Sequence, residues 1–135
     1  MKTLIHTATA LIAFGLTGCY TDTAPIGADV DDAIDYPQIT LSQRSLEAAL
    51  AFQKPVVTRI DGDLLRVTVP VRARSNETLH VEYKVVWLDV SGNPVPPDLI
   101  WTPLRLEPRQ PHNVVVNSTS PQATDFNMQF RWSKP

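Results

Sequence analysis

Cysteine is almost absent from this sequence, and the single one, Cys19, lies near the N-terminus. One cysteine cannot form an internal disulfide, and it cannot supply a zinc site built from several thiolates. Charge is nearly balanced as well, at −2 for the whole chain. Surfaces that bind nucleic acids need a clustered basic face, so we expect no nucleic-acid partner.

Motifs for catalysis or metal binding are also missing. The sequence has no nucleophile elbow, no phosphate-cradling glycine loop and no paired-carboxylate pattern. The run Asp29-Val30-Asp31-Asp32 lacks the glycine and the distal glutamate of a calcium loop. A metal site from His80, His112 and Glu82 has no ligand-spacing signature, so we expect a surface His80 and a half-buried, hydrogen-bonded His112. The sequence therefore predicts no enzyme, no cofactor and no metal.

Long hydrophobic runs are absent, since a bilayer span takes about 20 apolar residues. The apolar run from Thr3 to Phe14 is shorter and follows Lys2, which is typical of a signal peptide. Leu16-Thr17-Gly18-Cys19 closes it and resembles the lipobox of bacterial lipoproteins. The resemblance implies cleavage between Gly18 and Cys19, lipid attachment (palmitate-type acyl chains) on Cys19 and a membrane anchor. The alternatives are an ordinary secretory signal with a chance cysteine, or a buried structural cysteine.

The residues after the cysteine bear on location and on domain boundaries. No Asp stands second after Cys19, which favours the outer membrane, facing the periplasm, over the inner membrane. Residues 20–35 carry five acidic residues and little hydrophobic pattern, as a solvated linker does. We predict a lipoprotein signal peptide over residues 1–18, a lipidated N-terminus and flexible linker over 19–35, and a β-sandwich domain over 36–135.

The pattern of the domain is mainly that of β-strands. Twelve prolines argue against an all-helical protein. A short edge strand is predicted near residues 36–41, and one two-turn helix follows, with Leu46, Ala49 and Leu50 on one face. Asp61-Gly62 predicts a hairpin with a type I′ turn, and Pro70 predicts an edge or a bulge.

Apolar residues at every second position predict the strands that line the core. The predicted core sets are Leu65, Val67, Val69, Val71 and Ala73; Leu79, Val81, Tyr83, Val85 and Trp87; Leu104 and Leu106; His112, Val114 and Val116; and Phe126, Met128, Phe130 and Trp132. The gaps between them leave no room for the crossover helices that parallel strands need. The sequence predicts an antiparallel β-sandwich with one short helix.

Two groups of residues are candidates for an interaction surface. Arg66, Arg72 and Arg74 share one strand face and would form a basic strip for an anionic partner. The alternative is a solvated face with cross-strand ion pairs, in which Glu82 and Lys84 of the next strand lie opposite the arginines. Trp101 would be either an exposed anchor or a lid on the end of the core.

A set of short pieces in the second half of the chain carries a family resemblance. The pieces are Val69-Pro70-Val71-Arg72-Ala73-Arg74-Ser75, Val81-Glu82-Tyr83-Lys84, Trp87-Leu88-Asp89, Ser91-Gly92, Trp101, Leu104-Arg105-Leu106-Glu107-Pro108, Ser120-Pro121-Gln122-Ala123-Thr124-Asp125-Phe126 and Arg131-Trp132. They resemble the YcfL-like family of small periplasmic lipoproteins. The resemblance implies an immunoglobulin-like sandwich on a lipid tether, and it carries over no active-site residues.

These observations favour a lipid-anchored, non-enzymatic module that binds another envelope protein. Sheet edges and the long loop after residue 89 would supply its contact surface. The alternative is a binder of a small ligand, a glycan or a metabolite, which would require a concave pocket with convergent polar groups.

Overall fold

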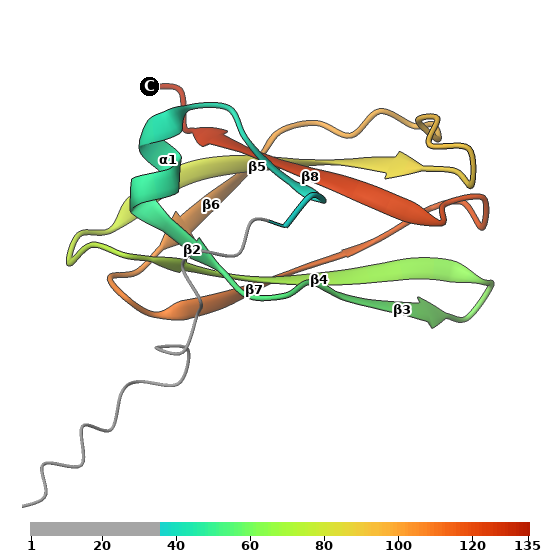
Figure 1. The fold of residues 1–135 in the computed structure, drawn as a ribbon, viewed down its shortest axis with the longest axis horizontal. Coiled ribbons are helices and arrows are strands. Elements are labelled where there is room, and N and C mark those ends of the chain that lie inside the picture. Colours follow the sequence, from blue (N-terminus) through green and yellow to red (C-terminus); the bar gives the residue numbers. More distant parts are fainter. Residues whose placement is uncertain (1–35) are drawn as a thin grey trace, which may run out of the picture.

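The computed structural model of the chain describes residues 36–135, which form two layers of β-structure (Figure 1). The predictions for residues 1–35, namely the signal peptide, the lipobox with Cys19 and the linker, lie outside the described residues. The elements follow one another as β1 (Ile39–Leu41), α1 (Arg44–Ala49), β2 (Leu50–Phe52), β3 (Val56–Ile60), β4 (Leu64–Ala73), β5 (Leu79–Leu88), β6 (Thr102–Leu106), β7 (Pro111–Asn117) and β8 (Asp125–Trp132).

The strands form two sheets. Sheet A has the order β1-β8-β5-β6. Sheet B is built around β4, with β7 along one edge and β2 and β3 in turn along the other. The sheets lie face to face, and α1 stands at one end, where the chain passes from sheet A to sheet B (Figure 1). The predicted β-sandwich with a short helix is confirmed for the described part of the chain.

One strand pairing differs from the prediction of an antiparallel fold. β1 lies parallel to β8, with Ile39 opposite Met128 and Leu41 opposite Phe130. The other pairings between the described strands are antiparallel. The prediction excluded parallel pairs because the connections between strands that are consecutive in the sequence are too short for a crossover. For β1 and β8 the crossover connection is the entire domain between them.

The core follows the alternation of the sequence. All five predicted core residues of β4 are at most 3% exposed. Phe126, Met128 and Phe130 of β8 are buried against them, as are Val81, Val85 and Trp87 of β5. Leu46 is the buried residue of α1, so this six-residue helix is held mainly by one side chain. Full burial of a large apolar side chain contributes about 1.5–3 kcal/mol.

Pro70 lies at a bulge in sheet B. Phe52 is opposite Val71, but Val56 is opposite Thr68, so the β2–β3 edge has one more residue than β4 over this stretch. The Pro70 carbonyl accepts a hydrogen bond from the Gln53 amide at 3.1 Å. The N and C=O of a strand residue point to the same edge, so the missing N–H of Pro70 faces the irregular stretch, where a regular ladder is interrupted. The prediction for Pro70 is confirmed as a bulge.

The Asp61-Gly62 hairpin forms, but its turn is not the predicted one. Ile60 pairs with Leu64, which leaves a loop of residues 61–63. Positive φ angles occur at Gly62 (79°) and Asp63 (60°), whereas a type I′ turn centred on Asp61-Gly62 would need them one residue earlier.

Two polar residues of β7 and the loop after it also differ from expectation. His112 is exposed rather than half-buried, because β7 is an edge strand and is well covered only near Val114. Ser118, expected in a polar loop, is 2% exposed. Its Oγ accepts a hydrogen bond from the Leu65 amide at 2.9 Å and donates one to the Ser120 carbonyl at 3.1 Å.

Candidate functional site

The three arginines of the predicted basic strip lie along the outer face of sheet B. Arg66 Nε donates to Asn117 Oδ1, and Arg74 Nε donates to the Leu50 carbonyl, each at 2.9 Å. Arg72 Nε is buried and has no hydrogen-bond partner within the described residues. Arg66 is exposed, whereas Arg72 and Arg74 are half-buried.

The predicted partners of these arginines are elsewhere. Glu82 and Lys84 belong to β5 in sheet A, whereas the strands beside β4 are β2, β3 and β7 of sheet B. Arg66 is opposite Thr58 and Asn117, and Arg72 is opposite Pro111. The prediction that Glu82 and Lys84 lie opposite these arginines is therefore wrong. The sequence does not reveal strand order. The prediction assumed that β4 and β5 are neighbours because they are consecutive in the chain, but they belong to different sheets.

Trp101 is not a lid on the core. It is half-buried and stands outside the hydrophobic core cluster of the described residues. It immediately precedes β6, whose Pro103 is opposite Glu82. Continuing this register places Trp101 beside Lys84, on the outer face of sheet A. Trp101 and the arginine strip therefore lie on different sheets, and the four predicted residues do not form one surface.

The Trp101 ring is instead the centre of a polar cluster. The Arg131 guanidinium lies 4.0 Å from the ring centroid, and Lys84 Nζ lies 5.2 Å from it. Arg131 Nε also donates to Glu82 Oε2 at 2.6 Å, in an ion pair whose side chains are 22% and 16% exposed. Such cation–π contacts contribute about 0.5–2 kcal/mol each, more as they are desolvated. We call Glu82, Lys84, Trp101 and Arg131 the Trp101 cluster.

The strand alternation alone indicated part of this cluster. It puts Glu82, Lys84 and Arg131 on outward positions of their strands, opposite the core-facing residues. The pairing of β5 with β8, which sets Glu82 opposite Arg131, was the missing information. The sequence shows only that one strand carries an outward acidic residue and another an outward basic residue. Many such combinations occur in any sheet, so this signal does not identify the pair.

Lys84 has no carboxylate partner among the ion pairs of residues 36–135. The Trp101 cluster therefore carries one formal positive charge that no ion pair of the described region balances. This chemistry suits a carboxylate from outside the domain.

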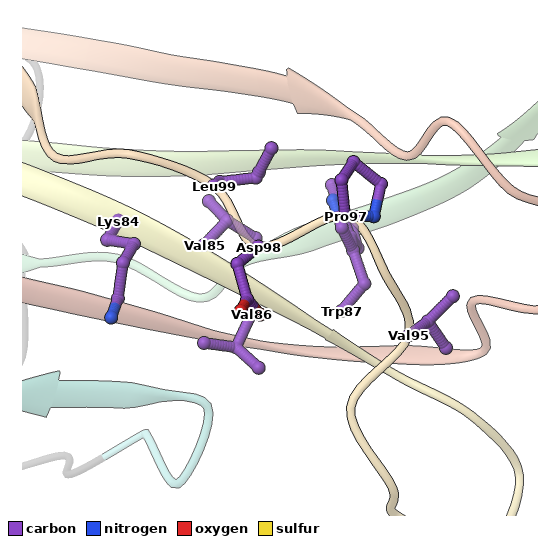
Figure 2. Close-up of a pocket in the computed structure, with 8 residues that line it drawn as sticks. All are labelled: Lys84, Val85, Val86, Trp87, Val95, Pro97, Asp98 and Leu99. Atoms are coloured by element: carbon purple, nitrogen blue, oxygen red, sulfur yellow. The ribbon is translucent and has the colours of Figure 1, made fainter.

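A small notch lies beside the Trp101 cluster, between β5 and the loop that connects β5 to β6 (Figure 2). Its volume is about 190 Å³. It is lined by Lys84, Val85, Val86 and Trp87 of β5 and by Val95, Pro97, Asp98 and Leu99 of the loop. Lys84 belongs to both features, so the notch and the cluster form one continuous candidate site.

The described part of the chain holds no grouping of side chains that suits a metal ion. Over residues 36–135, no three His, Cys, Asp or Glu side chains are placed to hold a metal ion. His80 lies on β5 of sheet A and His112 on β7 of sheet B, so these two histidines and Glu82 do not come together as a metal site. No helix within these residues has the length and apolarity that a membrane span requires.

Comparisons with known proteins identify relatives of the fold. The model of a family described as a protein of unknown function, DUF1425, matches residues 37–132. No curated protein matches the chain.

Two solved structures are similar to the described domain. The crystal structure of Cj0090 from Campylobacter jejuni is 20% identical, with a TM-score of 0.60, covering 73% of this chain and all of that one. A DUF1425 family member from Shewanella sp. PV-4 is also 20% identical, with a TM-score of 0.57, covering 64% of this chain and 80% of that one. At this identity the likeness concerns the fold.

Proposed function

We propose that this chain, which belongs to the DUF1425 family, is a lipid-anchored envelope protein whose sandwich domain binds another envelope protein without catalysing a reaction. We propose further that the YcfL-like lipoproteins, which the sequence resembles, belong to the same group. The observation that carries the proposed binding role is the Trp101 cluster.

The cluster has the residue types that dominate binding energy at protein interfaces. Tryptophan and arginine are enriched among hot spots, and both gain most when they are packed and desolvated at the centre of a contact. Trp101 is not part of the hydrophobic core cluster of the described domain, so core packing does not account for it. The neighbouring Ile100 is 83% exposed and adds apolar surface at the same place.

Preorganisation supports the same proposal. Arg131 is held by Glu82 and by the Trp101 ring before any partner arrives. Binding then loses less side-chain entropy, which otherwise costs about 0.5–1.5 kcal/mol per ordered side chain. Because Lys84 carries the unbalanced charge, we propose that the partner presents a carboxylate here.

The alternative of a binder for a free glycan or metabolite is less well supported. The notch, at about 190 Å³, is smaller than the roughly 300–1,000 Å³ of usual ligand pockets. It is better suited to one residue of a larger partner.

Photo-crosslinking in cells tests the proposed role. A photoreactive phenylalanine analogue at Ile100 should capture one dominant protein, and Trp101→Ala should reduce that product at least tenfold. The matched control is the same analogue at Val115, an exposed apolar residue on β7 of the other sheet. Equal capture from both positions, or an Ile100 product that is insensitive to Trp101→Ala, would contradict the proposal.

The anchor is proposed from the lipobox-like residues and is tested separately. Cys19→Ser should abolish palmitate labelling and release the protein from membranes. Two acyl chains hold far more firmly than one, at about 0.8 kcal/mol per buried methylene. A Cys19→Ser variant that remains labelled and membrane-bound would contradict the anchor and leave the binding proposal standing.

A further inference from the structure

The notch beside the Trp101 cluster is an interruption in sheet A. β6 pairs with β5 from Leu79 to Tyr83, and Val95 returns to β5 by donating to the Trp87 carbonyl at 2.8 Å. Between these points, residues 96–100 make no backbone hydrogen bond to β5 in the described structure. Figure 2 shows Pro97, Asp98 and Leu99 on the loop that passes alongside Lys84 to Trp87 of β5.

The peptide groups of Val85 face this gap. In an antiparallel strand, successive residues direct their N–H and C=O groups to opposite edges. His80 and Leu88 bond toward the β8 side, through Ser133 and Thr124, whereas Trp87 bonds toward the loop side. Val85 shares the direction of Trp87, so its N–H and C=O point into the notch rather than toward β8.

An unpaired peptide in the middle of a central strand is unusual. Val85 is 2% exposed, and buried backbone groups in folded proteins are nearly all paired with protein or water. The indole Nε1 of Trp87 also lacks a partner within the described chain, and Trp87 is 2% exposed. Two residues that line one notch thus carry polar groups that the domain itself leaves unsatisfied. Such groups call for a specific explanation.

Resting on the proposed function, we propose that the notch binds the C-terminal residue of the protein partner. The residue's N–H would donate to the Val85 carbonyl, and its carboxylate would accept from the Val85 N–H. Lys84 lines the notch, and its ammonium group lies over the Trp101 ring on the outer face of sheet A. From there it would form an ion pair with the same carboxylate. Capture of a chain end together with strand-type pairing is an established mode of peptide recognition.

The volume of the notch limits the residue it can take. At about 30 Å³ per water in the liquid, 190 Å³ corresponds to about six water molecules. A C-terminal alanine also has six heavy atoms, so the notch accepts a small terminal residue. Val95, Pro97 and Leu99 supply apolar walls for its side chain. Asp98 is exposed at the loop wall and favours a basic residue earlier in the partner's chain.

The test uses the full chain, labelled with ¹⁵N in detergent micelles, and the peptide N-acetyl-Lys-Ala with a free carboxylate. We expect saturable shifts at the Val85 amide and the Trp87 indole N–H. The same peptide with a C-terminal amide should bind at least tenfold more weakly. Lys84→Gln should weaken binding of the free acid about five- to tenfold, whereas Lys54→Gln, an exposed lysine between β2 and β3, should leave it unchanged.

Equal binding of acid and amide peptides, or the absence of saturable shifts at both N–H groups, would overturn the inference and leave the notch as a water-filled gap. Amide exchange gives a second readout. The Val85 amide should exchange at least a hundredfold faster than the Val81 amide, which lies within the paired part of β5. Equal protection would also overturn the inference. Capture of a partner from Ile100 alongside either negative result would reject the terminal-residue mode and retain the proposed function.

Discussion

Replacement of Ser118 by alanine removes a single hydroxyl group, and it should destabilise the domain much more than the loss of an exposed serine hydroxyl would. The Ser118 amide donates to the Leu65 carbonyl at 2.7 Å, and its Oγ accepts from the Leu65 amide at 2.9 Å. In a regular antiparallel pair the Leu65 amide would donate to a backbone carbonyl, and here the Ser118 hydroxyl takes the place of that carbonyl. Leu65 is 3% exposed, so its N–H cannot turn to water when the hydroxyl is removed.

The size of the effect follows from this burial. A buried donor left without a partner costs about 1–3 kcal/mol. The second bond, to the Ser120 carbonyl, adds less, because that carbonyl is only partly buried. For a domain of this size, each kcal/mol lowers Tm by about 4–8 °C, so Ser118→Ala should lower Tm by about 5–20 °C.

Chemical denaturation and thermal unfolding measure this directly, and Ser75→Ala is the matched control. Ser75 Oγ also makes two hydrogen bonds, to the Glu77 amide and carbonyl, but both are 3.3 Å long and exposed. Its removal should change stability by less than about 0.5 kcal/mol. If the two variants lose equal stability, the account of Ser118 as a substitute ladder partner is wrong.

Two further stability predictions concern α1 and the Trp101 cluster. Leu46→Ala should cost about 2–5 kcal/mol in urea unfolding, because Leu46 is the fully buried residue of α1, and a loss under 1 kcal/mol would show that the helix is held otherwise. A double-mutant cycle of Glu82→Gln and Arg131→Gln should give a coupling of about 1–2 kcal/mol, since both side chains are largely buried. The exposed Arg105–Glu107 pair should give under about 0.5 kcal/mol in the same assay, and equal couplings would refute the role of burial.

Strand content and core were predictable because they depend on local periodicity. Each inward residue of β4 could be named from alternation alone, since one face of a strand is buried or exposed as a unit. His112 failed this rule because it sits on an edge strand, and whether a strand lies at an edge depends on sheet order.

The candidate site was less predictable for the same reason. Trp101 was recognised as a residue of interest, but its neighbours come from β5 and β8, which are far apart in sequence. The notch depends on where β6 stops pairing with β5, and no residue type marks that point. Ser118 was missed because a serine in a polar loop looks like any other until its backbone register is known.

The parallel pairing of β1 with β8 has a consequence for when this protein becomes functional. The two strands come from opposite ends of the described domain, so their contact closes the longest loop in it. Pairings between distant segments form late, because the entropy of loop closure must be overcome before they stabilise anything. Arg131 belongs to β8, so the stacked arrangement over Trp101 cannot exist in a partly synthesised chain. The face that we propose for partner binding is therefore complete only when β8 is present and paired with β5, and a partner that recognises it binds only chains that extend through β8.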